Sequence, residues 1–318
     1  MKTMNRCEAA RFLAERDGFC ILTHRRPDGD TTGSAAALCL GLRQLGKRAF
    51  ILENPELTDR FAWLHEGLQK PAPEAADVLV SVDVAAPNML PKAFEPWRER
   101  ISLRIDHHGT ATSFTEWELV DSGAGACAEI VYDVLREMQV PLNREIATAL
   151  YVATSTDTGC FRFSNTTDHT FLVAAACAAA GAPVYELNQT LFETISLPRL
   201  RMQGWMVENS RLLCGGSVAV CPIPKAVEEE LGVTEDDMDN ISSFLRTIAG
   251  VRLAATLREK DDVVKVSVRG VPGYDAGAIC AGFGGGGHAG AAGATIRLPL
   301  AEAAAALEQA MVAQENSR

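Results

Sequence analysis

Three short apolar runs constrain the fold most, because each leads directly into acidic or histidine residues. The predicted strands cover residues 19–23, 77–83 and 100–105, and the polar residues at their ends are His24, Asp83 and Asp106. Near-continuous apolar runs of this length are typical of strands buried on both faces of a parallel sheet. Helical patterns lie between them. The sequence therefore predicts an α/β fold with an N-terminal, mostly parallel sheet, helices on both of its faces, and ligands beyond the carboxyl edge of its strands.

The first strand end, residues 23–34, places one imidazole and two carboxylates in a strand-to-helix turn: His24, Asp28 and Asp30. Two carboxylates about 4 Å apart repel each other by roughly 4 kcal/mol at an effective dielectric near 20, so one would become protonated without a counter-charge. A divalent metal ion removes this penalty. Thr31 or Thr32 is expected to cap the helix that carries residues 35–45.

Further candidate ligands follow at the same predicted edge. They are Asp83, the run Asp106, His107 and His108, and Asp157, which comes after a helical pattern over residues 144–153. Imidazole and carboxylate ligands without a thiolate favour Mn²⁺ over Zn²⁺. Two divalent ions about 3.5 to 4 Å apart, sharing a bridging carboxylate, would clamp a phosphoryl group and lower the pKa of a water molecule.

Each of these pieces also has a purely structural interpretation. The Asp-His-His run is compatible with a capped turn, Asp83 with a helix cap and Asp157 with an Asx-turn. His65 and His169 lie outside every cluster and are interpreted as ordinary histidines. Because the other clusters recur at the ends of successive elements, the metal interpretation is favoured.

The length of 318 residues favours two domains over one. We expect a catalytic domain over residues 1–193, a partly helical linker over 194–213 and a smaller α/β domain over 214–318, with a catalytic cleft between the two domains. The second domain contains a predicted hairpin, residues 251–258 and 263–269, and a glycine-rich segment, residues 284–293.

The glycine-rich segment is a candidate substrate site. Gly285, Gly286 and Gly287 allow the backbone to approach a ligand. His288 and Arg269 offer hydrogen-bond donors to a phosphate or a base. A purely structural glycine turn is the alternative, since glycines often mark tight turns.

Other arginines add positive charge near the predicted metal ligands. Arg162 follows Asp157 closely and is a candidate phosphate contact, with an ordinary surface arginine as the alternative. Arg25 and Arg26 lie inside the first strand-to-helix turn. The sequence assigns these two residues no fixed role.

Charge and cysteine content limit the class of partner and the compartment. The net charge of −11 should repel a long polyanion, so a nucleic-acid substrate is expected to be short. Nine cysteines without a Cys-x-x-Cys pair argue against a disulfide framework and a zinc ribbon. The first residues lack the apolar core of a secretion signal and no apolar stretch is long enough to cross a membrane, so we expect a cytoplasmic protein without a membrane partner.

Taken together, the motifs resemble those of the DHH phosphoesterase family. Four motifs carry this resemblance in order: His-x-x-Pro-Asp-x-Asp-x-x-Gly-Ser at 24–34, Asp83 at a strand end, Asp-His-His at 106–108, and Thr-Asp-Thr-Gly at 156–159. The run Gly-Gly-Gly-His-x-x-Ala-Ala-Gly at 285–293 is similar to the signature of the family's associated C-terminal domain. The chain length and residues 267–270 most resemble the bacterial nanoRNase and pAp phosphatase branch.

The resemblance implies a role for each motif residue. One metal ion would be held by His24, Asp28 and Asp157, and a second by Asp30 and His107, with Asp83 bridging the two. His108 would face the scissile phosphate and either orient the nucleophile or protonate the leaving oxygen. Asp106 would hold a histidine in the tautomer that its role requires.

The resemblance also implies hydrolysis of short oligoribonucleotides and of 3′-phosphoadenosine 5′-phosphate (pAp), with two divalent ions, most simply Mn²⁺. Cyclic or linear dinucleotides (c-di-AMP and pApA, c-di-GMP and pGpG) stay open as the main substrate. A RecJ-type single-strand exonuclease is less favoured, because only scattered arginines are present and no long duplex is expected to bind. A nucleotide-binding regulatory protein is the non-enzymatic alternative, and a homodimer stays open.

Overall fold

The computed structural model describes residues 2–109, 112–238 and 240–317, and the chain divides into two compact units, Met1–Thr194 and Ile195–Arg318. Each unit has its own sheet and its own core. The predicted α/β class is confirmed.

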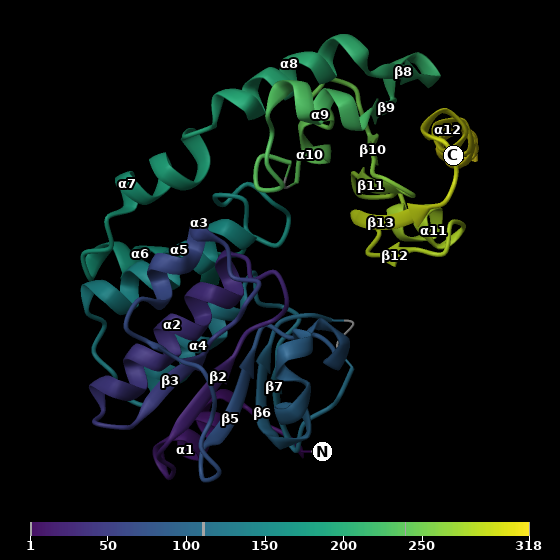
Figure 1. Cartoon of the computed structure of the whole chain (residues 1–318). Helices are drawn as coiled ribbons and strands as arrows, with labels where there is room; N and C mark the ends of the chain where they lie inside the picture. The colour runs from purple at the N-terminus through teal and green to yellow at the C-terminus, as the bar shows by residue number, and fades with distance from the viewer. Residues whose placement is uncertain (1, 110–111, 239, 318) are drawn as a thin grey trace. The chain divides into compact units, whose positions relative to one another are not determined.

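The sheet of the first unit is parallel throughout. Its strands are β1 (Lys2–Thr3), β2 (Phe19–Leu22), β3 (Ala49–Leu52), β4 (Gln69–Lys70), β5 (Val78–Val82), β6 (Ile101–Asp106) and β7 (Trp117–Val120). Their order in the sheet is β1-β7-β6-β5-β2-β3-β4. Figure 1 shows β2, β5, β6 and β7 running side by side. Strands β6, β5 and β2 are therefore neighbours whose carboxyl ends meet at one edge, and these are the three strands that end in candidate ligands.

Helices cover this sheet. They are α1 (Arg6–Ala14), α2 (Gly29–Gln44), α3 (Asp59–Ala62), α4 (Cys127–Glu137), α5 (Arg144–Asp157), α6 (Asp168–Ala179) and α7 (Val184–Asn188). Shorter 3-10 turns are η1 (Trp63–His65), η2 (Pro87–Met89) and η3 (Lys92–Arg100), and a π-helical turn, η4 (Gln189–Glu193), follows α7.

The two faces of the sheet are buried differently. On one face, fully buried side chains of α2, α4 and α5, such as Leu38, Ile130 and Leu150, pack with Ile21 and Leu103 of the strands. On the other face, Phe94 of η3 packs on the remaining strand side chains, for example Leu22 and Leu79, which are also fully buried. Burying one such side chain contributes about 1.5 to 3 kcal/mol relative to leaving it exposed.

The start of α2 differs from the prediction. Asp28, and neither Thr31 nor Thr32, is the N-cap: its Oδ1 accepts hydrogen bonds from the backbone N–H groups of Asp30 (3.0 Å) and Thr31 (3.2 Å). The threonine hydroxyls are engaged elsewhere, since Thr31 donates to the carbonyl oxygen of Val82 and Thr32 to that of Asp28. Cap preferences do not separate Asp from Thr by much, so the sequence pattern alone could not choose between them.

The second unit contains a mixed sheet. Its strands are β8 (Arg211–Leu213), β9 (Val218–Ile223), β10 (Leu253–Glu259), β11 (Val264–Gly270), β12 (Gly286–Gly287) and β13 (Ala291–Ile296), in the order β12-β13-β11-β10-β9-β8. Its helices are α8 (Leu197–Asn209), α9 (Lys225–Leu231), α10 (Ser242–Leu245), α11 (Ala276–Ala281) and α12 (Leu300–Asn316), with a 3-10 turn η5 (Cys214–Gly216). The predicted hairpin is β10 and β11, which pair antiparallel, while β9 and β10 pair parallel.

Segment 194–213, expected to be a partly helical linker, contains α8. Met202 and Met206 of this helix are fully buried in a core that also contains Ala219 and Cys221 of β9. Strand β7, by contrast, was missed by the sequence analysis. Within the described residues, no helix combines the length and the apolar character that a membrane crossing requires.

Candidate metal centre

The candidate ligands lie together at the carboxyl edge of the parallel sheet. His24 and Asp28 follow β2, Asp83 follows β5, and His107 and His108 follow β6. Asp30 lies in the first turn of α2, and Asp157 is the last residue of α5, which continues four residues past the helical pattern predicted from the sequence. Three groups of their ligand atoms each fall within 4.8 Å: Asp83, His107 and His108; His24, Asp28 and Asp83; and Asp30, His107 and Asp157.

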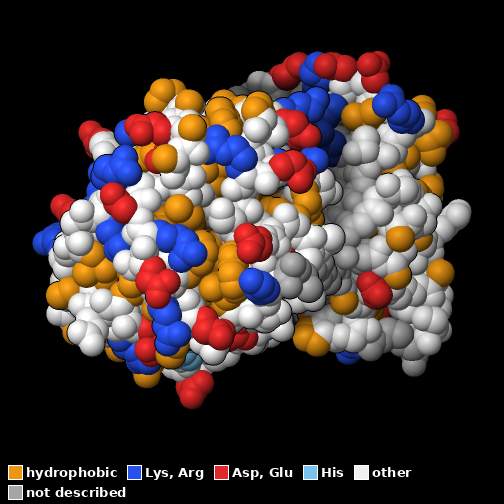
Figure 2. Space-filling view, turned by 90° about the horizontal axis from the view of Figure 1, so that it is seen from below, with side chains coloured by type: hydrophobic (Ala, Val, Ile, Leu, Met, Phe, Trp, Pro, Cys, Tyr) orange, Lys and Arg blue, Asp and Glu red, His pale blue; other side chains and the backbone are white. Residues whose placement is uncertain are grey.

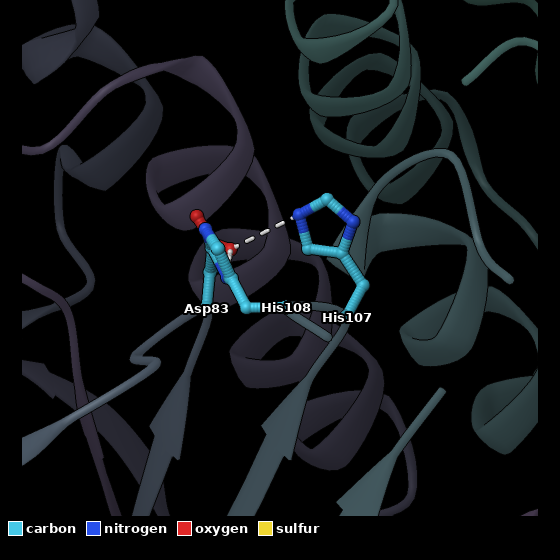
Figure 3. A group of neighbouring side chains, drawn as sticks. All are labelled: Asp83, His107 and His108. Carbon is cyan, nitrogen blue, oxygen red and sulfur yellow. Dashed lines mark ion pairs between the residues drawn. The ribbon is translucent and has the colours of Figure 1, made fainter. Parts of the chain in front are cut away.

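Asp83 is at the centre of this arrangement. Its Oδ2 lies 3.5 Å from Nε2 of His24, and its Oδ1 lies 3.5 Å from Nε2 of His107. Figure 3 shows the Asp83 carboxylate directed toward the His107 ring. The backbone of Asp83 is in the left-handed region (φ 58°), a conformation that non-glycine residues rarely adopt and that concentrates at functional sites.

The two histidines on either side of Asp83 are oriented in the same way. Nδ1 of His24 donates to the carbonyl oxygen of Arg25 (2.7 Å), and Nδ1 of His107 donates to that of Ala124 (3.2 Å). Nδ1 therefore carries a proton in both rings, and Nε2 is the ring nitrogen that faces the carboxylates. Such a backbone acceptor behind the ring is the usual arrangement for a metal-binding histidine.

Asp30 is held by the start of another helix. Its Oδ2 accepts the backbone N–H of Cys127 (2.6 Å), and its Oδ1 accepts that of Ala128 (3.1 Å), both in the first turn of α4. The hydroxyl of Ser34 donates to the same Oδ1 (3.0 Å). The N-terminus of a helix favours an anion, so α4 fixes the orientation of this carboxylate and favours its ionised form against the effect of burial.

Asp157 is held by Asn165. The side-chain amide of Asn165 donates to Oδ2 of Asp157 (3.2 Å), to its carbonyl oxygen (3.2 Å) and to the carbonyl oxygen of Gly125 (2.8 Å). Asp157 Oδ2 lies 3.8 Å from Nε2 of His107. The side chains therefore group Asp157 with His107 and Asp30, whereas the resemblance implied that it shares an ion with His24 and Asp28.

The electrostatics of the cluster fit a bound dication. Burial raises the pKa of Asp30 well above its ordinary value, and repulsion from Asp83 and Asp157 adds to the effect. Burial raises the pKa of Asp157 to about 7, with Asp83 and Asp28 as further causes, against the opposing effect of His107. Oδ1 of Asp83 is buried and has no hydrogen-bond partner among the described residues. Crowded carboxylates with an unsatisfied buried oxygen are the donor set that a divalent cation requires.

Without a bound metal ion, the histidines of the cluster carry positive charge. Burial opposes the charged form of His107, but its ion pair with Asp83 and the negative charges of Asp30 and Asp157 outweigh burial and raise its pKa to about 11. The same opposition acts on His24, whose pKa is raised well above normal by Asp28 and Asp83. Metal binding must therefore displace these protons.

His108 differs from the other two histidines because its Nδ1 faces a carboxylate. Nδ1 lies 2.8 Å from Oδ1 of Asp106, and the pKa of His108 is raised first by this hydrogen bond. Asp106 is fully buried and also accepts the backbone N–H groups of His107 (2.9 Å) and His108 (3.3 Å). Asp106 thus fixes both the loop after β6 and the ring of His108, which leaves Nε2 of His108 for a substrate.

A buried ion pair supports this loop from behind. Arg104 on β6 is 2% exposed and its Nη2 lies 2.9 Å from Glu118 Oε2 on β7, while its Nη1 lies 3.8 Å from Oδ2 of Asp106. Arg104 Nη1 also donates to the carbonyl oxygens of Ala85 and Thr112. Strand β7, which the sequence analysis missed, therefore contributes to the placement of the Asp-His-His motif.

The residues predicted to bind substrate divide between the two units. Arg162 belongs to the first unit, and its Nε donates to the carbonyl oxygen of Gly159 (2.6 Å), which closes the turn after α5. Arg269 and His288 belong to the second unit: Arg269 pairs with Ala291 between β11 and β13, and the backbone N–H of His288 donates to the carbonyl oxygen of Ala291 (2.8 Å). These two residues therefore lie at the same end of the second sheet.

Two of the predicted substrate-binding glycines have a structural reason to be glycine. A Cβ on Gly285 would lie 2.2 Å from the carbonyl oxygen of Gly293, and one on Gly287 would lie 2.6 Å from that of Ala291. Gly287 also has a φ of 143°. A Cβ on Gly286 would meet no atom within 4 Å, so the backbone is open to a ligand at that position.

Sequence reasoning missed the side chains and backbone groups that hold the ligands. Asn165 and Ser34 lie eight and four positions from the carboxylates that they contact, whereas the start of α4 contacts Asp30 from 97 positions away. The sequence shows only that Asn165 lies close to the Thr-Asp-Thr-Gly motif, and closeness in sequence does not reveal a hydrogen bond.

Both units of the chain match known protein families. Residues 18–154 match the DHH family N-terminal domain, and residues 215–313 match the DHHA1 domain. A Thermus thermophilus protein named bifunctional oligoribonuclease and PAP phosphatase NrnA is 34% identical over 281 residues, which cover 87% of this chain and 83% of that protein. A Bacillus subtilis protein of the same name is 28% identical, with 91% and 92% covered.

A solved structure shows the same fold. An exopolyphosphatase-related protein from Bacteroides fragilis superposes with a TM-score of 0.87 at 22% identity, and the match covers 96% of this chain and 95% of that protein. The resemblance seen in the motifs is thus confirmed over nearly the whole chain. The chain belongs to the DHH family of metal-dependent phosphoesterases, with a DHH domain followed by a DHHA1 domain, and it hydrolyses phosphoric esters.

Proposed function

We propose that this enzyme hydrolyses short oligoribonucleotides and pAp. The observation that carries the chemistry is the position of Asp83 between His24 and His107, with Asp28, Asp30 and Asp157 around them. The substrate class is supported by the names of the Thermus and Bacillus relatives, whose matches extend over most of each chain.

We further propose that the cluster holds two divalent ions, most simply Mn²⁺, because its donors are imidazole nitrogens and carboxylate oxygens. The candidate ligands are His24, Asp28, Asp30, Asp83, His107 and Asp157. When bound, such ions polarise a phosphoryl group and acidify a water molecule.

The protein's own groups then act on the substrate. Asp106 holds Nδ1 of His108, so Nε2 is positioned to hydrogen-bond the phosphate or to give a proton to the leaving oxygen. Asp83 lies between His24 and His107, with one carboxylate oxygen 3.5 Å from Nε2 of each ring.

We propose that residues 1–193 form the catalytic domain and 214–318 the substrate-binding domain. In the latter, Arg269, His288 and the backbone at Gly286 are the candidates for contact with nucleotide, and Arg162 adds a candidate phosphate contact in the former. Gly285 and Gly287 shape the same segment. A cytoplasmic location and a homodimer stay predictions, the latter to be measured by analytical ultracentrifugation.

Charge distribution favours a short substrate over a long one. The net charge is −11, and on the face shown in Figure 2 acidic and basic side chains are interspersed rather than gathered into a continuous basic track. A long strand needs such a track, because its phosphates contribute most of the affinity.

A substrate panel with Mn²⁺ tests the proposal. It comprises pAp, pApA, RNA from dinucleotides to about 24 nucleotides, and both cyclic dinucleotides. We expect hydrolysis of pAp and of the shortest RNAs, a steep loss of kcat/KM as the RNA lengthens, and no activity after exhaustive chelation. Asp83→Asn should abolish turnover, while Asp59→Asn, which changes an exposed carboxylate at the start of α3, should not.

The panel separates the alternatives. Rates that rise with strand length would favour a RecJ-type exonuclease, and preferred turnover of a cyclic dinucleotide would favour a cyclic-dinucleotide phosphodiesterase. Binding without turnover of any substrate would favour a regulatory protein. Hydrolysis that survives metal removal would refute the proposed mechanism.

A further inference from the structure

A cavity lies in the first unit beside the metal centre. Its volume is about 680 Å³, within the range of small-molecule sites. The charged residues of its lining are Arg25, Arg26, Glu56, Lys92, Glu95 and Arg98. None of them was assigned a function by the sequence motifs.

Several residues that line the cavity follow candidate metal ligands closely in the sequence. Arg25 and Arg26 directly follow His24, and Pro87 and Asn88 follow Asp83 by a few residues. Glu56 follows β3, which is the neighbour of β2 on the side away from β5. The cavity is thus formed at the same carboxyl edge, displaced by one strand, and the Cα atom of Arg25 is about 3.8 Å from that of His24.

The wall between the two sites is held in place by hydrogen bonds. The backbone N–H of Arg25 donates to the carbonyl oxygen of Met89 (2.6 Å), which ties the loop after β2 to the loop after β5. The side chain of Asn54 donates to the carbonyl oxygen of His24 (2.9 Å), which ties the loop after β3 to the same turn. Arg26 has a left-handed backbone (φ 49°), which such tethers can maintain.

The cavity has basic side chains that the protein does not neutralise. Arg98 is engaged with Glu95 (3.0 Å) and Glu99 (3.2 Å). Among the described residues, the side chains of Arg25, Arg26 and Lys92 form no ion pair or hydrogen bond, and all three are exposed. Unpaired cations in a concave site of this size favour an anionic ligand.

We propose that this cavity binds the nucleotide next to the scissile phosphoester, with Arg25, Arg26 and Lys92 contacting its phosphate. The inference rests on the proposed function and adds a second binding position to it. Glu56 is the one acidic residue of the lining whose carboxylate has no partner among the described residues. A carboxylate in this position can accept a hydrogen bond from a ribose hydroxyl, as carboxylates do in dinucleotide sites, so a nucleotide fits better than inorganic phosphate.

Single substitutions of the basic lining residues test whether the cavity binds a nucleotide. Arg26→Gln and Lys92→Gln should each raise KM for pApA and for a trinucleotide about tenfold, the effect of one charge-assisted hydrogen bond at an exposed site. kcat should change by less than about twofold, and KM for bis(p-nitrophenyl) phosphate, which has no second phosphate, should stay constant. Arg98→Gln is the matched control, since it removes the same charge from the same lining but from a residue already paired with Glu95.

Direct binding provides a second readout that does not depend on turnover. Titration calorimetry with pApA in EDTA should show weaker binding by Arg26→Gln and Lys92→Gln than by the wild type and by Arg98→Gln. Equal losses for all three variants would indicate a general charge effect and overturn the inference. Equal increases in KM for bis(p-nitrophenyl) phosphate, or unchanged constants with every substrate, would overturn it as well.

Failure of the proposed function gives a different pattern. If the wild type hydrolyses bis(p-nitrophenyl) phosphate but no nucleotide, the proposed substrate class is wrong. The calorimetric comparison then still decides whether the cavity binds a nucleotide. Thermal unfolding followed by circular dichroism verifies that each variant folds. Arg26→Gln and Lys92→Gln test the cavity independently of each other.

Discussion

At the residue scale, two carboxylates of the centre depend on groups that the motifs do not include. Asp30 depends on the backbone of Cys127 and Ala128, and Asp157 depends on the amide of Asn165. Groups that orient a metal ligand commonly change metal affinity by about 10- to 100-fold when they are removed. The motif residues are thus a part of the site, and their supports complete it.

Asn165→Ala should weaken metal binding about 10- to 100-fold, because Asp157 loses the donor that sets its orientation. Calorimetric titration of the metal-free protein with Mn²⁺ measures this affinity. Asn143→Ala is the control, since Asn143 caps the opposite end of the same helix through the N–H of Ile146. That variant should lose about 1 kcal/mol of stability and keep its metal affinity. Unchanged affinity in Asn165→Ala would show that the helix end alone orients Asp157.

His65 gives a pH dependence that is separate from the metal cluster. It is fully buried, its Nε2 donates to the carbonyl oxygen of Thr32 (3.0 Å), and burial lowers its pKa to about 4. The unfolded chain binds a proton below about pH 6.5, whereas the folded chain stays neutral at this residue until about pH 4. Stability from this residue is therefore complete at neutral pH and is lost as the pH falls between these two values.

His65→Gln should remove this dependence while keeping a donor for Thr32. Between about pH 7 and pH 5, the free energy of unfolding should fall by about 2 kcal/mol more in the wild type than in the variant. Urea unfolding of the metal-free proteins at both pH values measures the difference. Parallel losses in the two proteins would show that His65 is protonated in the folded state.

At the element scale, the N-terminus of α2 combines a helix cap with a candidate metal ligand. Oδ1 of Asp28 accepts two backbone N–H groups of α2 and also lies 3.6 Å from Nε2 of His24. An N-cap requires only an acceptor oxygen, whereas a metal ligand also requires negative charge. The two requirements can therefore be separated by substitution.

Asp28→Asn should keep the cap and lose metal affinity, while Asp28→Ala should lose both. In EDTA, the free energy of unfolding of the alanine variant should be about 1 kcal/mol lower than that of the asparagine variant. Both variants lack the carboxylate, so relief of repulsion from Asp83 and Asp157 cancels in this comparison. Equal stability of the two would mean that Asp28 does not cap α2 in solution.

At the scale of the whole molecule, the chain has separate hydrophobic cores. Leu103 is fully buried in the core of the first unit, and Leu257 is fully buried in that of the second. Proteins with several domains commonly unfold in more than one step, because each core cooperates mainly within itself. The units divide between Thr194 and Ile195, whereas the sequence predicts a linker over residues 194–213 between the two domains.

Leu257→Ala should destabilise one unit by about 2 to 5 kcal/mol and leave the other unchanged. Differential scanning calorimetry should show one shifted transition and one constant transition, and Leu103→Ala should shift the opposite one. A common shift of both transitions in either variant would show that the units unfold as one cooperative body.

The sequence by itself determined the central strands of the first sheet and the chemistry of their carboxyl edge. Continuous apolar runs ending in Asp or His can bury both faces only in a parallel sheet, and parallel strands bring their carboxyl ends to one side. The strand ends therefore bring His24, Asp83 and His107 to one edge of the sheet. This prediction depends only on residues that are neighbours in the sequence, so the sequence contains all the information that it needs.

Only the tertiary structure decided how the site is held and what lies beside it. The order β6-β5-β2-β3 places Arg25, Arg26 and Lys92 around one cavity, although up to 67 positions separate them. It also brings the start of α4 to Asp30 and the pair of Arg104 and Glu118 behind Asp106. Hydrogen bonds and cavities depend on distances of a few ångström between segments that are far apart in the chain, and no periodicity in the sequence encodes those distances.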